Sequence, residues 1–144
     1  MLQSSIAVLL SGILFVLSGI HFYWAWGGRW AAGVVVPARE NGQKVFEPRP
    51  FETIIVAFSL MCTGIYILIR ASLIRVILPH WLMQYGLYIL GGLFLLRAIG
   101  EGRYVGFFKR IRKTTFGQLD TKYFSPFCLL LSILFFVLSI MLKR

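Results

Sequence analysis

The sequence predicts an all-α integral membrane protein in which a single domain forms an antiparallel four-helix transmembrane bundle. Hydrophobic residues make up 58% of the 144 residues, whereas soluble domains contain ~45–50%. The mean hydropathy is +0.80. Charged residues, 14% of the chain, are confined to short segments. The long apolar runs between them approach the ~20 residues that a helix needs to cross a membrane.

Four such runs follow one another, over residues 6–26, 51–69, 80–99 and 124–142. The segment before the first run, "MLQSS", has no Lys or Arg, and the run exceeds the ~7–15 apolar residues of a signal peptide core. We therefore expect it to be a retained span. In every run the apolar residues lie all round the helix, so each helix needs lipid or other helices on every side.

The charges of the connecting segments predict the orientation. The segments 27–50 and 101–123 share one side of the membrane and contain ten basic residues, against four on the opposite side. The ten are Arg29, Arg39, Lys44, Arg49, Arg103, Lys109, Arg110, Arg112, Lys113 and Lys122. Because Lys and Arg accumulate in cytoplasmic loops, these two loops are expected in the cytoplasm and both termini outside a bacterial inner membrane. The net charge of +10 then reflects topology and contact with membrane lipids, so nucleic acid is not an expected partner.

The two long loops have different patterns. Asn41-Gly42 favours a turn, with residues 34–36 and 45–46 as the arms of a short hairpin. In the second loop the aromatic residues Tyr104, Phe107 and Phe108 share a helical face with Ile111 and are surrounded by bases. That pattern is typical of a helix that lies along lipid headgroups.

Polar residues collect at the cytoplasmic ends of the four runs. This predicted layer contains His21, Tyr23, Trp24, Glu52, Arg97, Glu101, Tyr104, Asp120 and Tyr123. A polar stripe continues along the second run at helical spacing and is expected to line the bundle interior, because unpaired polar groups are costly in lipid. Its members are Glu52, Ser59, Cys62, Thr63, Tyr66 and Arg70.

These residues have structural as well as functional interpretations. Trp24, with its neighbouring tryptophans, fits an interfacial belt better than a ligand cage. Arg97 and Glu101, spaced i,i+4, fit an ion pair. His21 is either a packing residue bonded to a neighbouring helix or a contact for a ligand or proton. No metal site is predicted, since no His, Cys or carboxylate lies three or four residues after His21, and no short catalytic motif indicates a cofactor.

Serines repeat every seven residues in the first and fourth runs. Ser4, Ser11 and Ser18 form one seam, and Ser125, Ser132 and Ser139 form the other. Since small residues let membrane helices approach closely, we expect these two helices to pack against each other along the seams.

Three stretches carry a resemblance that spans nearly the whole chain: "IHFYWAWGGRW", "LRAIGEGRYVGFFKR" and "LDTKYFSP". With them the chain resembles the family of domain of unknown function 3995, small four-helix bacterial membrane proteins. The resemblance implies the fold and membrane residence, and no activity. The motif positions are His21, Trp24, Gly27, Arg97, Glu101, Arg103, Tyr104, Asp120 and Pro126.

A second similarity is confined to "RYVGFFKR" and "YFSPF", within residues 103–127. These resemble part of the membrane-associated eicosanoid and glutathione metabolism proteins, which are trimers of four-helix bundles. This chain departs from that family in its first long loop, with its Pro and Asn-Gly turns, which puts glutathione binding in doubt.

The sequence favours one function class over two others. A hydrophobic or amphipathic small molecule or lipid would bind in a polar pocket at the cytoplasmic leaflet. His21, Glu52, Arg97 and Glu101 would be its polar contacts, and Trp24 and Tyr104 its aromatic walls. The alternatives are an enzyme acting on a lipophilic substrate, with His21 or Glu52 as general acid or base, and a structural subunit. Self-association into a homo-oligomer stays open.

Overall fold

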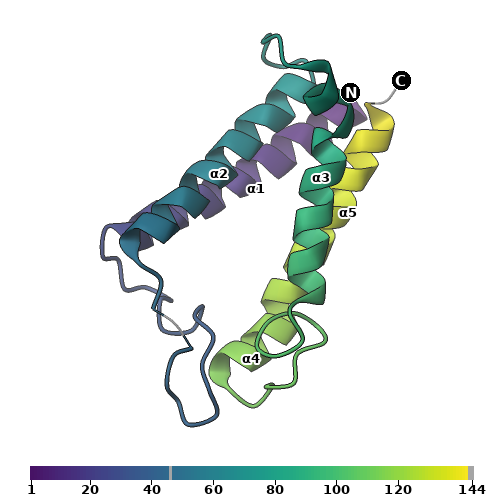
Figure 1. Ribbon diagram of the computed structural model, residues 1–144. Helices are drawn as coiled ribbons and strands as arrows, with labels where there is room; N and C mark the ends of the chain where they lie inside the picture. The colour runs from purple at the N-terminus through teal and green to yellow at the C-terminus, as the bar shows by residue number, and fades with distance from the viewer. Residues whose placement is uncertain (46, 143–144) are drawn as a thin grey trace.

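The computed structural model describes residues 1–45 and 47–142, and the regular elements within them are helices (Figure 1). They are α1 (Leu2–Ala25), α2 (Pro50–Arg70), α3 (His80–Ile99), α4 (Thr115–Leu119), the π-helical η1 (Asp120–Phe124) and α5 (Ser125–Met141). Helices α1, α2 and α3 and the continuous stretch Thr115–Met141 are each long and apolar enough to cross a membrane. The all-α class and the four spans are confirmed. The first helix begins earlier than predicted, and the last begins nine residues earlier, at Thr115 rather than 124.

The four long helices form two helical hairpins, α1 with α2 and α3 with α5. In the first, the Ser11 hydroxyl donates to the Gly64 carbonyl at 3.0 Å and the Ser18 hydroxyl to the Ala57 carbonyl at 2.7 Å. Residue numbers rise along α1 while they fall along α2, so these two helices run antiparallel. In the second hairpin the Ser132 hydroxyl donates to a backbone carbonyl of α3 at 2.8 Å.

The prediction that the first and last spans pack together along their serine seams is therefore wrong. All the serines of the two seams except the partly buried Ser4 are buried, but Ser11 and Ser18 face α2, and Ser132 faces α3. The physical reasoning about small residues holds, since each seam allows a close helix approach. Heptad spacing alone did not identify the partner helix.

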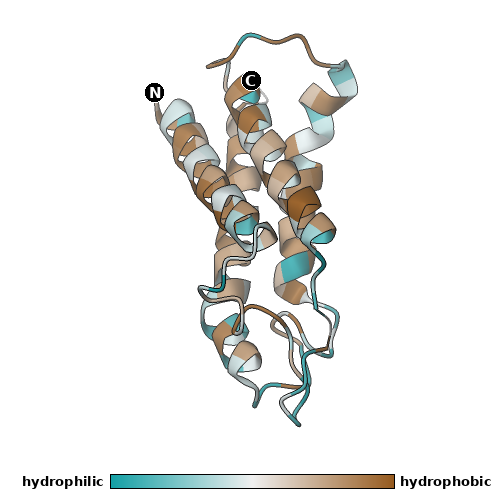
Figure 2. Cartoon of the chain, turned by 90° about the vertical axis from the view of Figure 1, so that its left-hand side faces the viewer, coloured by the Kyte–Doolittle hydropathy of each residue, from teal (hydrophilic) through white to brown (hydrophobic). Residues whose placement is uncertain are grey.

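The hydrophobic core lies at the end of the molecule that holds both termini. Its fully buried members include Leu10, Leu14, Ile67, Leu87 and Phe135, from the first part of α1 and α3 and the last part of α2 and α5. Figure 1 shows the two hairpins close together at this end and diverging toward the long loops. The 71–79 connection at the core end is mostly hydrophobic, and the long loops at the opposite end carry more hydrophilic residues (Figure 2).

The first long loop contains the predicted turn, with different arms. Gly42 has φ +81° in the Asn41-Gly42 turn, which suits glycine. The bridge joins Ala38 and Lys44, and the Arg39 amide donates to the Gln43 carbonyl at 2.8 Å. The first arm therefore lies at residues 37–39 and not at the predicted 34–36. Val45 of the predicted second arm does pair, since its amide donates to the Pro37 carbonyl at 2.8 Å, and residue 46 lies outside the described residues.

The interfacial helix predicted over residues 104–113 is not formed. Instead the chain turns back on the end of α3, where the Phe107 amide donates to the Ala98 carbonyl at 2.9 Å. Gly100 and Gly106 have φ +83° and +87° and lie against each other, so that a Cβ on either would collide with the facing backbone. These glycines break the helical pattern of the aromatic and basic side chains.

Candidate functional site

A buried ion-pair cluster centred on Asp120 occupies the end of α3 and the start of α5. The Asp120 side chain is fully buried, and its Oδ1 accepts from Arg97 Nη2 at 3.0 Å. Its Oδ2 accepts from Lys109 Nζ at 2.8 Å, from the Gly106 amide at 2.8 Å and from the Ser125 hydroxyl at 3.0 Å. Three of the four donors thus share Oδ2, and Oδ1 receives one, so the carboxylate is bonded through both of its oxygens.

Local structure explains how these groups converge. The π-helical turn of η1 brings the Ser125 amide to the Asp120 carbonyl, and the same turn places the two side chains together. The 100–114 loop presents the Gly106 amide inward, and Lys109 Nζ also donates to the Gly106 carbonyl at 2.9 Å. Lys109, 1% exposed, is the inward-facing member of a run of bases whose other members lie outside. The cluster thus holds the 100–114 loop on the ends of α3 and α5.

His21 and Trp24 lie in a separate aromatic group at the end of α1. His21 Nδ1 is 2.7 Å from the Leu17 carbonyl of its own helix, and its ring meets the Trp24 ring edge-on at 5.1 Å between centroids. The Trp24 indole N–H donates to the Trp30 carbonyl at 2.8 Å. His21 therefore makes its bond within α1, not to a neighbouring helix.

The acidic candidates make local contacts as well. Glu52 caps the start of α2 by accepting from the Arg49 amide at 3.2 Å, and Glu101 accepts from the Tyr104 amide at 2.8 Å. The predicted Arg97–Glu101 ion pair is wrong, because Arg97 pairs with Asp120. The structure thus brings Arg97 together with Asp120, which was expected in the same layer, and leaves the other predicted contacts in separate groups.

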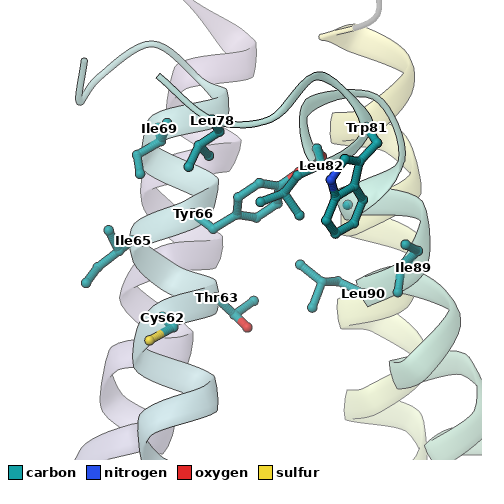
Figure 3. Close-up of a pocket in the computed structure, with 11 residues that line it drawn as sticks. Cys62, Thr63, Ile65, Tyr66, Ile69, Leu78, Trp81, Leu82, Ile89 and Leu90 are labelled. Carbon is teal, nitrogen blue, oxygen red and sulfur yellow. Dashed lines mark hydrogen bonds between the residues drawn. The ribbon is translucent and has the colours of Figure 1, made fainter. Parts of the chain in front are cut away.

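A groove of about 500 Å³ opens between α2 and α3 toward the core end (Figure 3). Its walls are almost wholly apolar. The lining residues are Cys62, Thr63, Ile65, Tyr66, Ile69, Leu78, Trp81, Leu82, Gly86, Ile89 and Leu90. Sequence reasoning identified only part of the α2 wall: Cys62, Thr63 and Tyr66 of the predicted polar stripe line the groove, whereas Glu52 and Ser59 are exposed and do not. It missed the α3 wall, whose Trp81, Leu82 and Leu90 look like any other apolar residues of a span.

Tyr66 crosses this groove from α2 to α3 (Figure 3). Its hydroxyl donates to the Leu82 carbonyl at 2.7 Å and occupies the space that a side chain on Gly86 would need. Thr63 returns its hydroxyl to the Ser59 carbonyl of its own helix at 2.8 Å, so its polar atom is already bonded. The groove surface is therefore suited to hydrocarbon. Within residues 1–45 and 47–142 no group of three or more His, Cys, Asp or Glu residues could hold a metal ion.

No curated protein and no solved structure matches the chain. A family model described as "Protein of unknown function (DUF3995)" matches residues 14–135. The matched range includes the Asp120 cluster, both walls of the groove and at least half of each span. With four helices able to span a membrane, the protein is a multi-pass membrane protein that belongs to this family of unknown function, as the sequence resemblance predicted.

Proposed function

We propose that the protein binds the hydrocarbon chain of a membrane lipid in the groove between α2 and α3. One observation carries the proposal. An apolar groove of about 500 Å³ opens sideways between α2 and α3, two helices that are long and apolar enough to cross a membrane. Its volume falls within the ~300–1,000 Å³ of small-molecule sites. Hydrocarbon surrounds a span at this depth, so a lipid chain is the occupant that the surroundings supply.

The packing of the two hairpins supports this proposal. Ser11 and Ser132 join α1 to α2 and α5 to α3, and leave α2 and α3 without a comparable seam between them. Tyr66 bridges the two helices at one level only. A chain that enters from the side would extend the apolar contacts along the rest of the gap.

The proposal includes an orientation. With the two basic loops in the cytoplasm of a bacterial inner membrane, the groove opens within the outer leaflet. A polar pocket at the cytoplasmic leaflet, with His21, Glu52, Arg97 and Glu101 as contacts, stays a prediction. So does catalysis by His21 or Glu52, and so does self-association.

Native mass spectrometry of the protein in mild detergent, with added phospholipid, tests the groove. Thr63→Phe places a ring in the groove and is expected to abolish retention of one lipid per chain. Ser59→Phe is the matched control, since Ser59 makes the same bond to its own helix at 2.8 Å, is exposed and does not line the groove. Wild-type protein that retains no lipid, or equal retention by both variants, would contradict the proposal. A dimer lost only in Thr63→Phe would assign the groove to a second copy of the chain instead.

A further inference from the structure

The groove has a cationic group at its end nearest the 71–79 connection. Arg70 is the last residue of α2, one turn beyond Tyr66 and next to Ile69, both of which line the groove. The Nε of Arg70 is buried and has no hydrogen-bond partner among the described residues. A buried N–H without an acceptor is costly. Arg70 as a whole is only partly buried, so an anion from outside the chain can approach the residue and offset its charge.

The charges around Arg70 favour an anion. The five acidic residues, Glu40, Glu47, Glu52, Glu101 and Asp120, lie in the long loops or in the helix ends next to them. The 71–79 connection contains Arg75 and no acidic residue. The carboxylate side chains therefore lie at the opposite end of the bundle from Arg70, whereas Arg97 is paired with Asp120.

The depth of the groove matches one leaflet. From Trp81 to Leu90 the α3 wall rises about 13.5 Å at ~1.5 Å per residue. Half of a ~30 Å hydrocarbon core is about 15 Å. Trp81, 58% exposed in the first turn of α3, lies where interfacial tryptophans lie. A lipid with its chain in the groove thus has its headgroup at the level of Arg70.

We infer that the occupant is an anionic phospholipid whose phosphate is held by Arg70 while one of its acyl chains fills the groove. This rests on the proposed function and adds the headgroup and the residue that selects it. A guanidinium binds phosphate oxygens through charge-assisted, often paired, hydrogen bonds. A phospholipid with net negative charge neutralises Arg70, whereas the quaternary ammonium of phosphatidylcholine offsets its own phosphate.

Competition between phosphatidylglycerol and phosphatidylcholine with identical acyl chains tests the inference by native mass spectrometry. Wild-type protein is expected to retain phosphatidylglycerol preferentially, and Arg70→Gln to lower that preference about tenfold, which corresponds to about 1.4 kcal/mol, while total retention persists. Arg75→Gln is the control, because Arg75 is exposed in the 71–79 connection and does not line the groove. Arg70→Met, which keeps the apolar stem, replaces Arg70→Gln if the latter does not fold.

Anionic lipid also meets the basic loops at the other end, and a double-mutant cycle separates the two contributions. In the Thr63→Phe background the groove is filled, and the remaining lipid is that bound at the basic loops. Arg70→Gln should not change the headgroup preference of that lipid. Retention of lipid with a preference that Arg70→Gln leaves unchanged would overturn the inference and leave the groove proposal standing. The same loss of preference with and without Thr63→Phe would place the headgroup site outside the groove and also overturn it. Absence of retained lipid in the wild type would instead overturn the proposed function.

Discussion

Removal of the Asp120 charge should destabilise the protein through the cation that it leaves behind. In Asp120→Asn, Lys109 would stay buried, at 1% exposed, without its carboxylate partner. Its Nζ would keep the Gly106 carbonyl and, at most, the neutral amide oxygen at position 120, and neither carries a compensating charge. Breaking a buried pair in this way costs about 3–5 kcal/mol, because the remaining charge is uncompensated.

The companion variant Lys109→Met should cost less. Asp120 would keep Arg97 as its countercharge, with the Gly106 amide and the Ser125 hydroxyl as further donors. The expected loss is that of one hydrogen bond to a charged group, roughly 1.5–3 kcal/mol. In the double variant Asp120→Asn with Lys109→Met the fully buried cation is gone, and the cation left without a carboxylate is the partly exposed Arg97. Its cost should therefore fall short of the sum of the two single costs by at least about 1 kcal/mol.

Reversible unfolding in detergent, followed by circular dichroism, measures these differences. Limited trypsin digestion gives a second reading, because Arg110 and Lys113 are exposed in the loop that the cluster holds and should be cleaved faster in Asp120→Asn. Costs that add to within about 0.5 kcal/mol would show that the two side chains act independently. A loss below about 1 kcal/mol in Asp120→Asn would refute the reasoning that this cluster is buried and paired.

Three further predictions follow from the packing. Gly86→Ala should displace the Tyr66 hydroxyl and cost about 1–3 kcal/mol in unfolding experiments, whereas Gly92→Ala, with open space at its Cβ, should be neutral or stabilising; equal effects would contradict the crossing contact. Ser132→Ala should lose one hydrogen bond, about 0.5–1.5 kcal/mol, and Ser132→Ile should lose more by overpacking; a tolerated Ile would contradict the close approach to α3. With Cys62 and Cys128 replaced, Gln43→Cys in intact cells should resist a membrane-impermeant thiol reagent and Ser72→Cys should react, and the reverse pattern would contradict the proposed orientation.

The spans were predictable because hydropathy is a local property that a membrane enforces along about 20 residues. The partners of the helices were not predictable in the same way. The serines of α1 and α5 showed by their spacing which face would be buried. Which helix covers that face depends on the whole bundle, and Gly64 and Gly91 opposite Ser11 and Ser132 become meaningful only in the structure.

The candidate site was likewise predictable only in part. Asp120 and Arg97 were assigned to one layer from helix lengths alone, and the structure joins them. The Arg97–Glu101 pair failed because an i,i+4 spacing requires the helix to continue, whereas α3 ends at Ile99 and Gly100 adopts a positive φ. Lys109 was counted among the basic loop residues that predict the orientation in the membrane. No local pattern distinguishes a buried lysine from its exposed neighbours when its partner lies eleven residues away.

The two ends of the bundle differ in how their cationic side chains are paired. At the long-loop end, Asp120 pairs with two cations, Lys109 and Arg97, although Arg97 Nη1 is also buried without a partner among the described residues. At the opposite end, Arg70 has a buried Nε without a partner among the described residues and no acidic neighbour in the adjoining connection. In the function that we propose, an anion from the membrane would offset the charge of Arg70 as Asp120 offsets that of Lys109 and Arg97, and its chain would lie in the neighbouring apolar groove.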